Sequence, residues 1–415
     1  VNIAAHKIAL APNKRQATAL RRHCGAARVA YNHARNEFEA ALGKGDWRND
    51  MDLRRSFNAV KRELYPWISE LSANASKNAI IHLGNACKRW NADRKARKTG
   101  KKTGGDRVGF PKPRSIKRGG YRYQADNGAG TVKTDGKRVK LPRVGWVRMR
   151  EHPRFDGAIR NSFVSERGGR WFVTLTYNIP DNSPERGGET LGIDMGLKTL
   201  ATLSDGTRIE SPKALKAAQS ELRRLNKKLA RQKRGSNRRA RTKLALSKCH
   251  ARIANIRGDL AHKTTSAISK REGLGVVKVE TLNIRGMMRN RRLSRAFADA
   301  GIADWLRTLG YKCAREGIRI VKIDRWHPSS RLCNHCGAKN DTLTLATRDW
   351  HCGGCGAKND RDLNAARNIK DAPSCGVKAR GERVRPVANF AGAMLDEART
   401  RQLSLNLATA TPIAD

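Results

Sequence analysis

The spacing of apolar side chains divides the start of the chain into a strand, a helical unit and a connector. Residues 3–10 predict a strand that ends before Pro12. From Gln16 to about residue 93 the apolar positions recur at helical spacing, which predicts a helical unit. Residues 94–118 consist largely of Lys, Arg, Gly and Pro, which predicts a flexible basic connector or, equally, a plain solvated linker.

Short β-rich runs separated by Gly or Asp-Gly turns occupy residues 119–180. The stretch TDGKR, flanked by VK and VKL, predicts a hairpin. A small barrel or meander fits this pattern, and we expect it to include the strand at residues 3–10. The helical unit would then be an insertion within a β domain.

From residue 186 onward, buried strands alternate with helices. Residues 186–212 predict two apolar strands around a turn, and residues 273–282 and 307–325 add two more strands and the end of a helix. Between residues 222 and 260, apolar residues recur at helical spacing on both sides of a Gly-Ser-Asn break, which predicts an antiparallel helical hairpin. This alternation is typical of α/β domains. Residues 373–415 lack a sustained pattern and predict a disordered or weakly docked tail.

The charge balance points to a polyanionic partner. The 415 residues are enough for two or three domains, and they carry 86 Lys and Arg against 37 Asp and Glu, a formal charge of +49. Such a surface repels itself unless a polyanion neutralises it, so nucleic acid is the expected partner. The predicted hairpin is the most basic segment, because residues 222–243 include 11 basic and no acidic side chains. A solvated helix face is the alternative interpretation.

Membrane and secretory classes are disfavoured. No segment approaches the roughly 18 apolar residues of a membrane span, and the N-terminal residues have no signal-peptide core. Nine cysteines, four of them in two C-x-x-C pairs, suit metal binding in a reducing compartment. We therefore expect a cytoplasmic prokaryotic protein that acts at the nucleoid and has no membrane partner.

The two cysteine pairs predict a structural zinc site. Cys333-x2-Cys336 and Cys352-x2-Cys355 are separated by 15 residues, as in four-cysteine zinc ribbons. Gly337 follows the first pair and lets its turn close, and a glycine follows the second pair in the same way. Four protein ligands leave no open position for water, so one zinc ion would stabilise the fold. A redox pair or four unrelated thiols are the alternatives.

Acidic residues are scarce, so those at strand ends are informative. Asp194 and Glu280 end apolar strands, and Asp360 and Asp362 open a helix after the second cysteine pair. Burying a carboxylate is costly unless a cation meets it. Three such carboxylates could hold two Mg²⁺ ions for attack of water on a phosphodiester. Taken singly, each has a plain alternative, a surface turn residue or a helix cap.

Several motifs together resemble the TnpB proteins of insertion sequences, RNA-guided DNA endonucleases related to type V CRISPR effectors. They are KIALAPNKRQ, GAARVAYNHA, GIDMGLKTLATLSDG, VVKVETLNIRGM, YKCAREGIRIVKID, PSSRLCNHCG and RDWHCGGCGAKNDRDLNAARNI, which span residues 7–369. The resemblance implies a multidomain α/β plus β-barrel fold. Its nuclease domain would be RuvC-like, of RNase H topology, with an inserted zinc ribbon, and a wedge β-barrel carrying a helical recognition insert would precede it.

The resemblance also implies domain bounds and a catalytic triad. The wedge barrel would comprise residues 1–12 and 94–183, and the recognition domain would comprise residues 13–93. The nuclease domain would comprise residues 184–327 and 360–372, with its helical hairpin at about 214–270. The zinc ribbon would comprise residues 328–359, and the tail residues 373–415. The three RuvC carboxylates, which would hold the two Mg²⁺ ions, fall on Asp194, Glu280 and Asp362, with Asp360 as the other candidate. Asn364 would support that helix start.

One position departs from the family pattern: Asn359 stands where the family often has His. The intact acidic positions argue against the nuclease-dead relatives that act as RNA-guided repressors.

The resemblance implies that a guide RNA binds the basic channel and that target double-stranded DNA is cut beside a short adjacent motif. Lys77 and Asn78 are candidate readers of that motif. Candidate contacts to the nucleic-acid backbone are Arg223, Arg224, Lys227, Arg231, Arg234, Arg238 and Arg239.

A compact type V CRISPR effector with a CRISPR RNA, a non-cleaving regulator and a strand-joining transposase remain alternatives. The sequence does not predict the guide sequence, the adjacent motif, the cut pattern or the oligomeric state.

Overall fold

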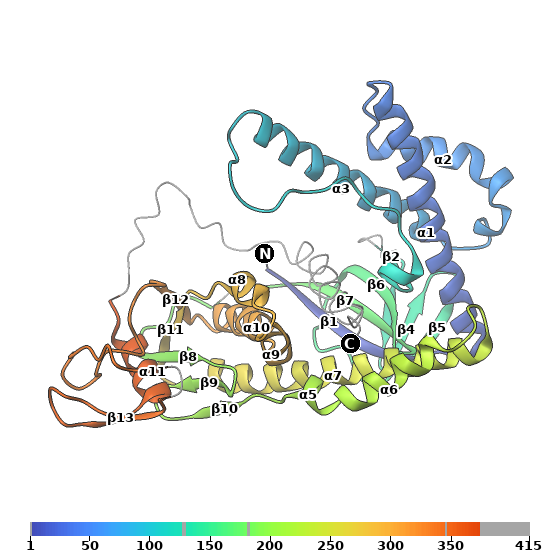
Figure 1. Ribbon diagram of the computed structural model, residues 1–415. Coiled ribbons are helices and arrows are strands. Elements are labelled where there is room, and N and C mark those ends of the chain that lie inside the picture. The colour runs from blue at the N-terminus through green and yellow to red at the C-terminus, as the bar shows by residue number, and fades with distance from the viewer. Residues whose placement is uncertain (1, 127–129, 181–182, 345–346, 374–415) are drawn as a thin grey trace. The chain divides into compact units, whose positions relative to one another are not determined.

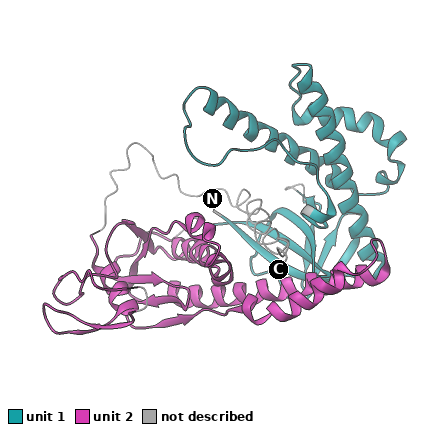
Figure 2. Ribbon diagram, in the orientation of Figure 1, with its two compact units in different colours: residues 1–180, 389–415 teal, residues 181–388 magenta. Residues whose placement is uncertain are grey.

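The computed structural model describes residues 2–126, 130–180, 183–344 and 347–373 and divides into two compact units. Of the described residues, those up to residue 180 form unit 1 and those from 183 to 373 form unit 2 (Figure 2). The predicted tail, apart from its first residue, lies outside the described residues.

Unit 1 is built on a seven-stranded sheet with the order β2-β6-β7-β1-β5-β4-β3 (Figure 1). The strands are β1 (Asn2–Ala11), β2 (Arg122–Asp126), β3 (Lys133–Asp135), β4 (Arg138–Leu141), β5 (Gly145–Met149), β6 (Ile159–Arg167) and β7 (Arg170–Ile179). The N-terminal strand lies in the middle of this sheet, pairing antiparallel with β7 along its length and with β5 at Leu10 and Ala11. Its expected place among the later strands is therefore confirmed, as is the hairpin of β3 and β4 around Gly136.

The sheet of unit 1 is open, which corrects the expectation of a barrel. Within the described residues no pairing joins the edge strands β2 and β3. A barrel closes only when its first and last strands pair. Here β2 packs against helices instead, and β3 is three residues long and exposed throughout. A short exposed edge and a helix-covered edge are both common ends of an open sheet.

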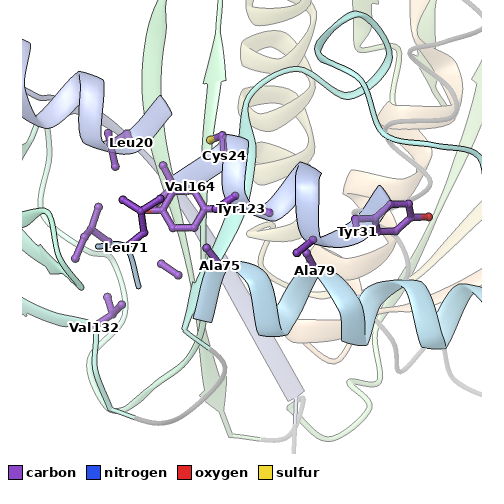
Figure 3. Close-up of a cluster of buried hydrophobic side chains, with 14 of the residues drawn as sticks. Leu20, Cys24, Tyr31, Leu71, Ala75, Ala79, Tyr123, Val132 and Val164 are labelled. Carbon is purple, nitrogen blue, oxygen red and sulfur yellow. The ribbon is translucent and has the colours of Figure 1, made fainter. Parts of the chain in front are cut away.

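The helices of unit 1 lie between β1 and β2 along the chain. They are α1 (Lys14–Gly43), α2 (Asp50–Leu64), the 3-10 helix η1 (Pro66–Ile68) and α3 (Ala73–Lys98), and the short α4 (Ile116–Gly119) comes later. Asn13 begins α1 with a capping box, because its side chain and that of Gln16 each accept a hydrogen bond from the other residue's backbone N–H. The helices and the sheet share one core, whose labelled members include Cys24, Ala75 and Val164 (Figure 3).

The basic connector is more ordered than the sequence predicts. Its first residues, 94–98, continue α3. Beyond them, the buried Asp93 accepts hydrogen bonds from Arg97, Lys102 and the backbone N–H of Val108. Because a buried carboxylate needs such partners, Asp93 fastens the connector to α3.

Unit 2 contains a five-stranded mixed sheet with the order β10-β9-β8-β11-β12. The strands are β8 (Glu189–Met195), β9 (Thr199–Leu203), β10 (Arg208–Glu210), β11 (Leu274–Glu280) and β12 (Arg319–Ile323). β8 pairs antiparallel with β9, while β11 runs parallel to both β8 and β12. The predicted α/β alternation is thus confirmed in this unit.

Helices cover both faces of this sheet. The helices of unit 2 are α5 (Ala214–Ala217), α6 (Gln219–Ala230), α7 (Asn237–Ser269), α8 (Ile284–Arg289), α9 (Ser294–Ala300), α10 (Ile302–Arg315) and α11 (Arg361–Asp371), of which α6 packs on α7 and not on the sheet. The end of α7 and α10 share a core with Leu191 and Ile193 of β8. Since successive strand residues point to opposite faces, Gly192 faces the other way, and α11 packs there.

The predicted helical hairpin is confirmed as α6 and α7, joined at residues 231–236. Its two helices share a small core of their own around Leu222, Leu225 and Ile253. Between β12 and α11, the strands β13 (Asp349–His351) and β14 (Lys358–Asp360) form a two-stranded sheet.

Candidate metal sites

The four cysteines converge on one point. Among the described residues, Cys333, Cys336, Cys352 and Cys355 form the one group of three or more potential ligands whose ligand atoms all lie within 4.8 Å of one another. The Sγ atoms of Cys333 and Cys355 are 3.7 Å apart, and those of Cys336 and Cys352 are 3.5 Å apart. Zn–S bonds of ~2.3 Å in a tetrahedron require S–S distances of about 3.8 Å. The donor set therefore fits zinc.

Backbone N–H groups prepare this site for a cation. Gly337 N donates to Cys333 O at 2.8 Å and Gly356 N donates to Cys352 O at 2.9 Å, which closes the two turns as predicted. Burial raises the pKa of Cys333, but the N–H groups of Cys336 and His335 outweigh it and lower this pKa to about 6. A thiolate at neutral pH is the form that binds zinc.

Asn359 contributes to this site in a way the sequence does not show. Its Nδ2 lies 3.5 Å from the Sγ of Cys333 and donates to it, and the residue is buried. The position that departs from the family pattern thus carries a hydrogen-bond donor to a thiolate.

The cysteine knuckle, residues 329–360, is tied to α11 by amide side chains. Asn364 accepts from Asn334 N at 2.8 Å and donates to Leu332 O at 2.6 Å. Asn368 donates to Ser329 O and Leu332 O, both at 2.7 Å. Asn364 therefore bonds the knuckle, whereas the sequence assigned it to the helix start.

The acidic residues lie at one edge of the unit 2 sheet. Asp194 is the penultimate residue of β8 and Glu280 is the last residue of β11. Ile193 is paired with Val279 in the parallel register, so the residues that come next, Asp194 and Glu280, lie side by side on the two strands. Asp362 belongs to the first turn of α11.

Gly192 allows α11 to approach so closely. A Cβ atom at this position would lie 2.1 Å from Ala366 O and 2.5 Å from Lys370 N. Any side chain would therefore collide with the helix backbone. The glycine two residues before Asp194 thus lets the helix that bears Asp362 rest directly on β8.

The three carboxylates form one electrostatic group. Burial, followed by the negative charges of Glu280 and Asp362, raises the pKa of Asp194 to about 7, while Arg361 acts in the opposite direction. Within the described residues, the oxygen atoms of these three carboxylates do not all lie within 4.8 Å of one another, whereas the four cysteine sulfurs do. Like charges this close disfavour the state in which all three groups are ionised.

Each neighbouring carboxylate has a distinct partner. Glu280 accepts a hydrogen bond from the hydroxyl of the buried Ser329. Asp362 pairs with Arg348 at 3.1 Å. Asp360 accepts from Leu363 N at 2.9 Å as the N-cap of α11 and pairs with Arg208 at 2.8 Å. The plain helix-cap role therefore describes Asp360, and the group around Asp194 includes Asp362.

The predicted nucleic-acid contacts differ in exposure. Arg223, Arg224, Lys227, Arg231, Arg234 and Arg238 are exposed on the hairpin. Arg239 is half-buried, and its guanidinium donates to Leu229 O and Gln232 O at the end of α6. In α3, Lys77 is half-buried and Asn78 is buried, with its Nδ2 unpaired. The structure thus presents the hairpin cations to solvent but not the Asn78 side chain.

No helix within the described ranges is long and apolar enough to cross a membrane.

Comparisons with known proteins identify three family models along the chain. Residues 174–291 match the OrfB_IS605 model, described as a probable transposase. Residues 304–369 match the Cas12f1-like TNB domain, and residues 2–43 match a helix-turn-helix domain. In the structure the last of these ranges holds one strand and one helix, β1 and α1.

Two curated relatives align over nearly the whole chain. A protein of Streptomyces pristinaespiralis named "Putative RNA-guided DNA endonuclease" is 32% identical over 391 residues, which cover 92% of this chain and 92% of its own. InsQ of Escherichia coli K12, with the same description, is 29% identical and covers 92% of this chain and 94% of its own. The solved Cas12f1-sgRNA-target DNA complex covers 90% of this chain and 100% of its own, with 17% identity and a TM-score of 0.34.

Proposed function

Since this chain belongs to the IS605 OrfB/TnpB family, we propose that it is an RNA-guided DNA endonuclease that hydrolyses its target at a RuvC-type site formed by Asp194, Glu280 and Asp362. The observation that carries the proposal is the electrostatic interaction of Asp194 with Glu280 and Asp362. These three side chains come from two neighbouring strands and from the helix after the knuckle. Family membership alone would not distinguish a nuclease from a binding protein.

The carboxylates suit Mg²⁺. Magnesium prefers carboxylate oxygens, and a cation would relieve the repulsion that raises the pKa of Asp194. When bound, Mg²⁺ would supply an activated water and stabilise charge on the phosphodiester. Asp194, Glu280 and Asp362 would hold two such ions.

The chain's own residues place those ligands. Adjacent parallel strands fix Asp194 and Glu280 at the same sheet edge. Ser329 orients the Glu280 carboxylate by its hydrogen bond, and Gly192 lets α11 bring Asp362 close. The zinc bound by the four cysteines would be structural, because all four of its positions are protein ligands.

Nucleic acid would be held through its phosphates. The exposed cations of the α6–α7 hairpin suit a guide RNA or the heteroduplex that it forms with target DNA. In this proposal the wedge domain, residues 1–12 and 94–183, corresponds to unit 1 up to residue 180, and unit 1 also contains the recognition domain, residues 13–93, which would read the adjacent motif. Unit 2 contains the nuclease domain, residues 184–327 and 360–372, and the zinc ribbon, residues 328–359.

The test is cleavage by the full chain purified with its co-expressed guide RNA. We expect Mg²⁺-dependent breaks in a matching plasmid, and a loss of at least about 1,000-fold in rate for Asp194→Ala with the RNA still bound. Asp341→Asn, an exposed aspartate of the knuckle, is the matched control and should cleave normally. Equal cleavage by Asp194→Ala would refute the assigned site, and sequence-specific binding without cleavage by the wild type would indicate a regulator.

A further inference from the structure

Trp326 exposes its indole ring to an unusual degree. Its exposed fraction is 80%, the largest among the exposed large hydrophobic residues of the described chain, and the next, Met51, reaches 56%. A free indole loses the contacts that normally stabilise this side chain, and tryptophan is among the residues that most often anchor ligands. An exposed Trp on a held loop therefore calls for an explanation.

The loop that carries Trp326 is fixed by hydrogen bonds. Trp326 N donates to the Asp324 carboxylate at 2.9 Å, and His327 N donates to Asp324 O at 3.3 Å. Ser329 N then donates to His327 O at 2.8 Å. The Arg325 guanidinium lies 5.1 Å from the centre of the indole ring. The ring is thus held beside a cation and in solvent, without being buried.

Both ends of this loop meet the carboxylate site. At its start, Ile323 of β12 is paired with Glu280. At its end, Ser329 donates to the Glu280 carboxylate, and Asn368 of α11 holds the Ser329 carbonyl. Trp326 lies three residues from each of these anchors, a reach of at most about 10 Å, so the loop that carries the indole borders the edge of the sheet where Glu280 ends β11.

We propose that Trp326 stacks on a nucleobase of the single DNA strand that enters the carboxylate site and so positions the neighbouring phosphodiester. This inference rests on the proposed nuclease function. Every base has a π-face, so stacking tolerates any sequence, as a guided nuclease requires. The Arg325 cation adds attraction for the adjacent phosphate. Trp326 would be a positioning residue that acts on the substrate and not on a metal.

The first test needs no cleavage. The full chain with the Asp194→Ala substitution is loaded with guide RNA. This complex is bound to targets that carry 2-aminopurine at successive positions of one strand or the other. We expect quenched fluorescence at one or two positions, lost in Trp326→Ala and retained in part in Trp326→Tyr. Trp146→Ala, a 40% exposed Trp of unit 1 that also lies beside an arginine, is the matched control and should leave the signal unchanged. The same label placed in the guide RNA separates an RNA base from a DNA base.

The second test uses the cleaving protein. Trp326→Ala should slow cleavage by about 5- to 150-fold, the range expected for loss of one stacked base. An abasic nucleotide at the quenched position should slow the wild type similarly and add nothing to the variant. Zinc content and melting temperature establish whether Trp326→Ala is folded. If Trp326→Ala is not folded, Trp326→Tyr is used instead.

The outcomes separate the two hypotheses. Undiminished quenching in Trp326→Ala, quenching only from the guide RNA, or additive effects of the variant and the abasic site would overturn the stacking proposal while leaving the nuclease assignment intact. Equal cleavage by Asp194→Ala would overturn the assigned carboxylate site, absence of cleavage by the wild type would overturn the nuclease function, and in either case the fluorescence arm would still report on stacking. If Trp326→Ala changes neither cleavage nor fluorescence but abolishes binding of a protein partner, the ring is assigned to a protein contact.

Discussion

At the scale of single residues, Asp194 has the most informative environment. Its pKa is raised from 3.8 to about 7 by burial and by the charges of Glu280 and Asp362. The folded protein therefore keeps this proton at pH values where the unfolded chain has lost it. Between about pH 4 and 7 the folded state binds more protons, so without metal this group lowers stability as pH rises.

This argument predicts the behaviour of Asp194→Asn. Without Mg²⁺ the variant should differ little from the wild type at pH 4 and below, where Asp194 is largely protonated in both the folded and the unfolded state, and exceed it at pH 8 by on the order of 4 kcal/mol. Thermal unfolding of both proteins at the two pH values measures the difference. Saturating Mg²⁺ should reverse the order at pH 8. A stability difference between the variant and the wild type that is constant with pH would show that the pKa of Asp194 is not raised in the folded protein.

Gly192 gives a second prediction at this scale. Gly192→Ala places a Cβ atom 2.1 Å from Ala366 O, so α11 has to move away from β8. We expect a loss of about 1–3 kcal/mol in stability and at least about tenfold in cleavage. The measurements are chemical unfolding and plasmid cleavage.

Gly310→Ala is the matched control, since a Cβ atom there meets nothing within 4 Å in α10. It should be neutral or stabilising by up to about 1 kcal/mol. Equal behaviour of the two variants would contradict the close approach of α11.

The residues predicted from the sequence share a local signal. The cysteines have a fixed spacing, and Asp194 and Glu280 stand out because few acidic residues follow apolar strands. Ser329 and Asn368 have no such signal. Ser329 reaches Glu280 across 49 positions, and Asn368 reaches the Ser329 carbonyl across 39, so only the fold brings them together.

At the scale of elements, the hydrogen bonds between the knuckle and α11 couple the zinc site to the carboxylate site. Loss of zinc should free Leu332 and Asn334 and thus weaken the bonds that Asn364 and Asn368 make. We expect Cys336→Ser to lower amide hydrogen-exchange protection in residues 361–371 by about tenfold or more, because local opening becomes easier.

Cys249→Ser makes the same chemical change at a buried cysteine of α7, outside the knuckle. Protection of residues 361–371 should be unaffected there. Unchanged protection in Cys336→Ser would mean that α11 is held by the sheet alone.

Element type was more predictable than element association. Helical spacing correctly indicated α1, α3 and the α6–α7 hairpin, because a period is a local property. Whether β2 and β3 close a barrel depends on what covers β2, and α3 packs there through contacts such as that of Asn74 with Ala125, which are 51 positions apart. The grouping of the carboxylates was predictable only in part, since the choice between Asp360 and Asp362 depends on which side chain caps α11.

At the scale of the whole molecule, the formal charge of +49 should make nucleic-acid binding strongly salt-dependent. The triple variant Arg223→Ala, Arg224→Ala, Lys227→Ala should reduce the slope of log affinity against log salt by about 2–3, or about 0.7–0.9 for each phosphate contact. Guide-RNA binding measured between about 50 and 200 mM salt gives the slope.

Lys263→Ala is the control on α7, since Lys263 already pairs with Asp259 at 2.8 Å. Its slope should remain that of the wild type. A triple variant with an unchanged slope would remove the hairpin from the proposed nucleic-acid surface.

The central position of β1 also bears on how unit 1 is made. β1 alone joins β2, β6 and β7 to β5, β4 and β3, yet it leaves the ribosome first, and Ile8 has to wait for Val173. At synthesis rates of about 5–20 residues per second, that wait lasts on the order of 10–30 seconds. During this interval β1 has at most β5 as a partner, at Leu10 and Ala11, so substitutions in β1 would act on the yield of folded protein before they act on any site.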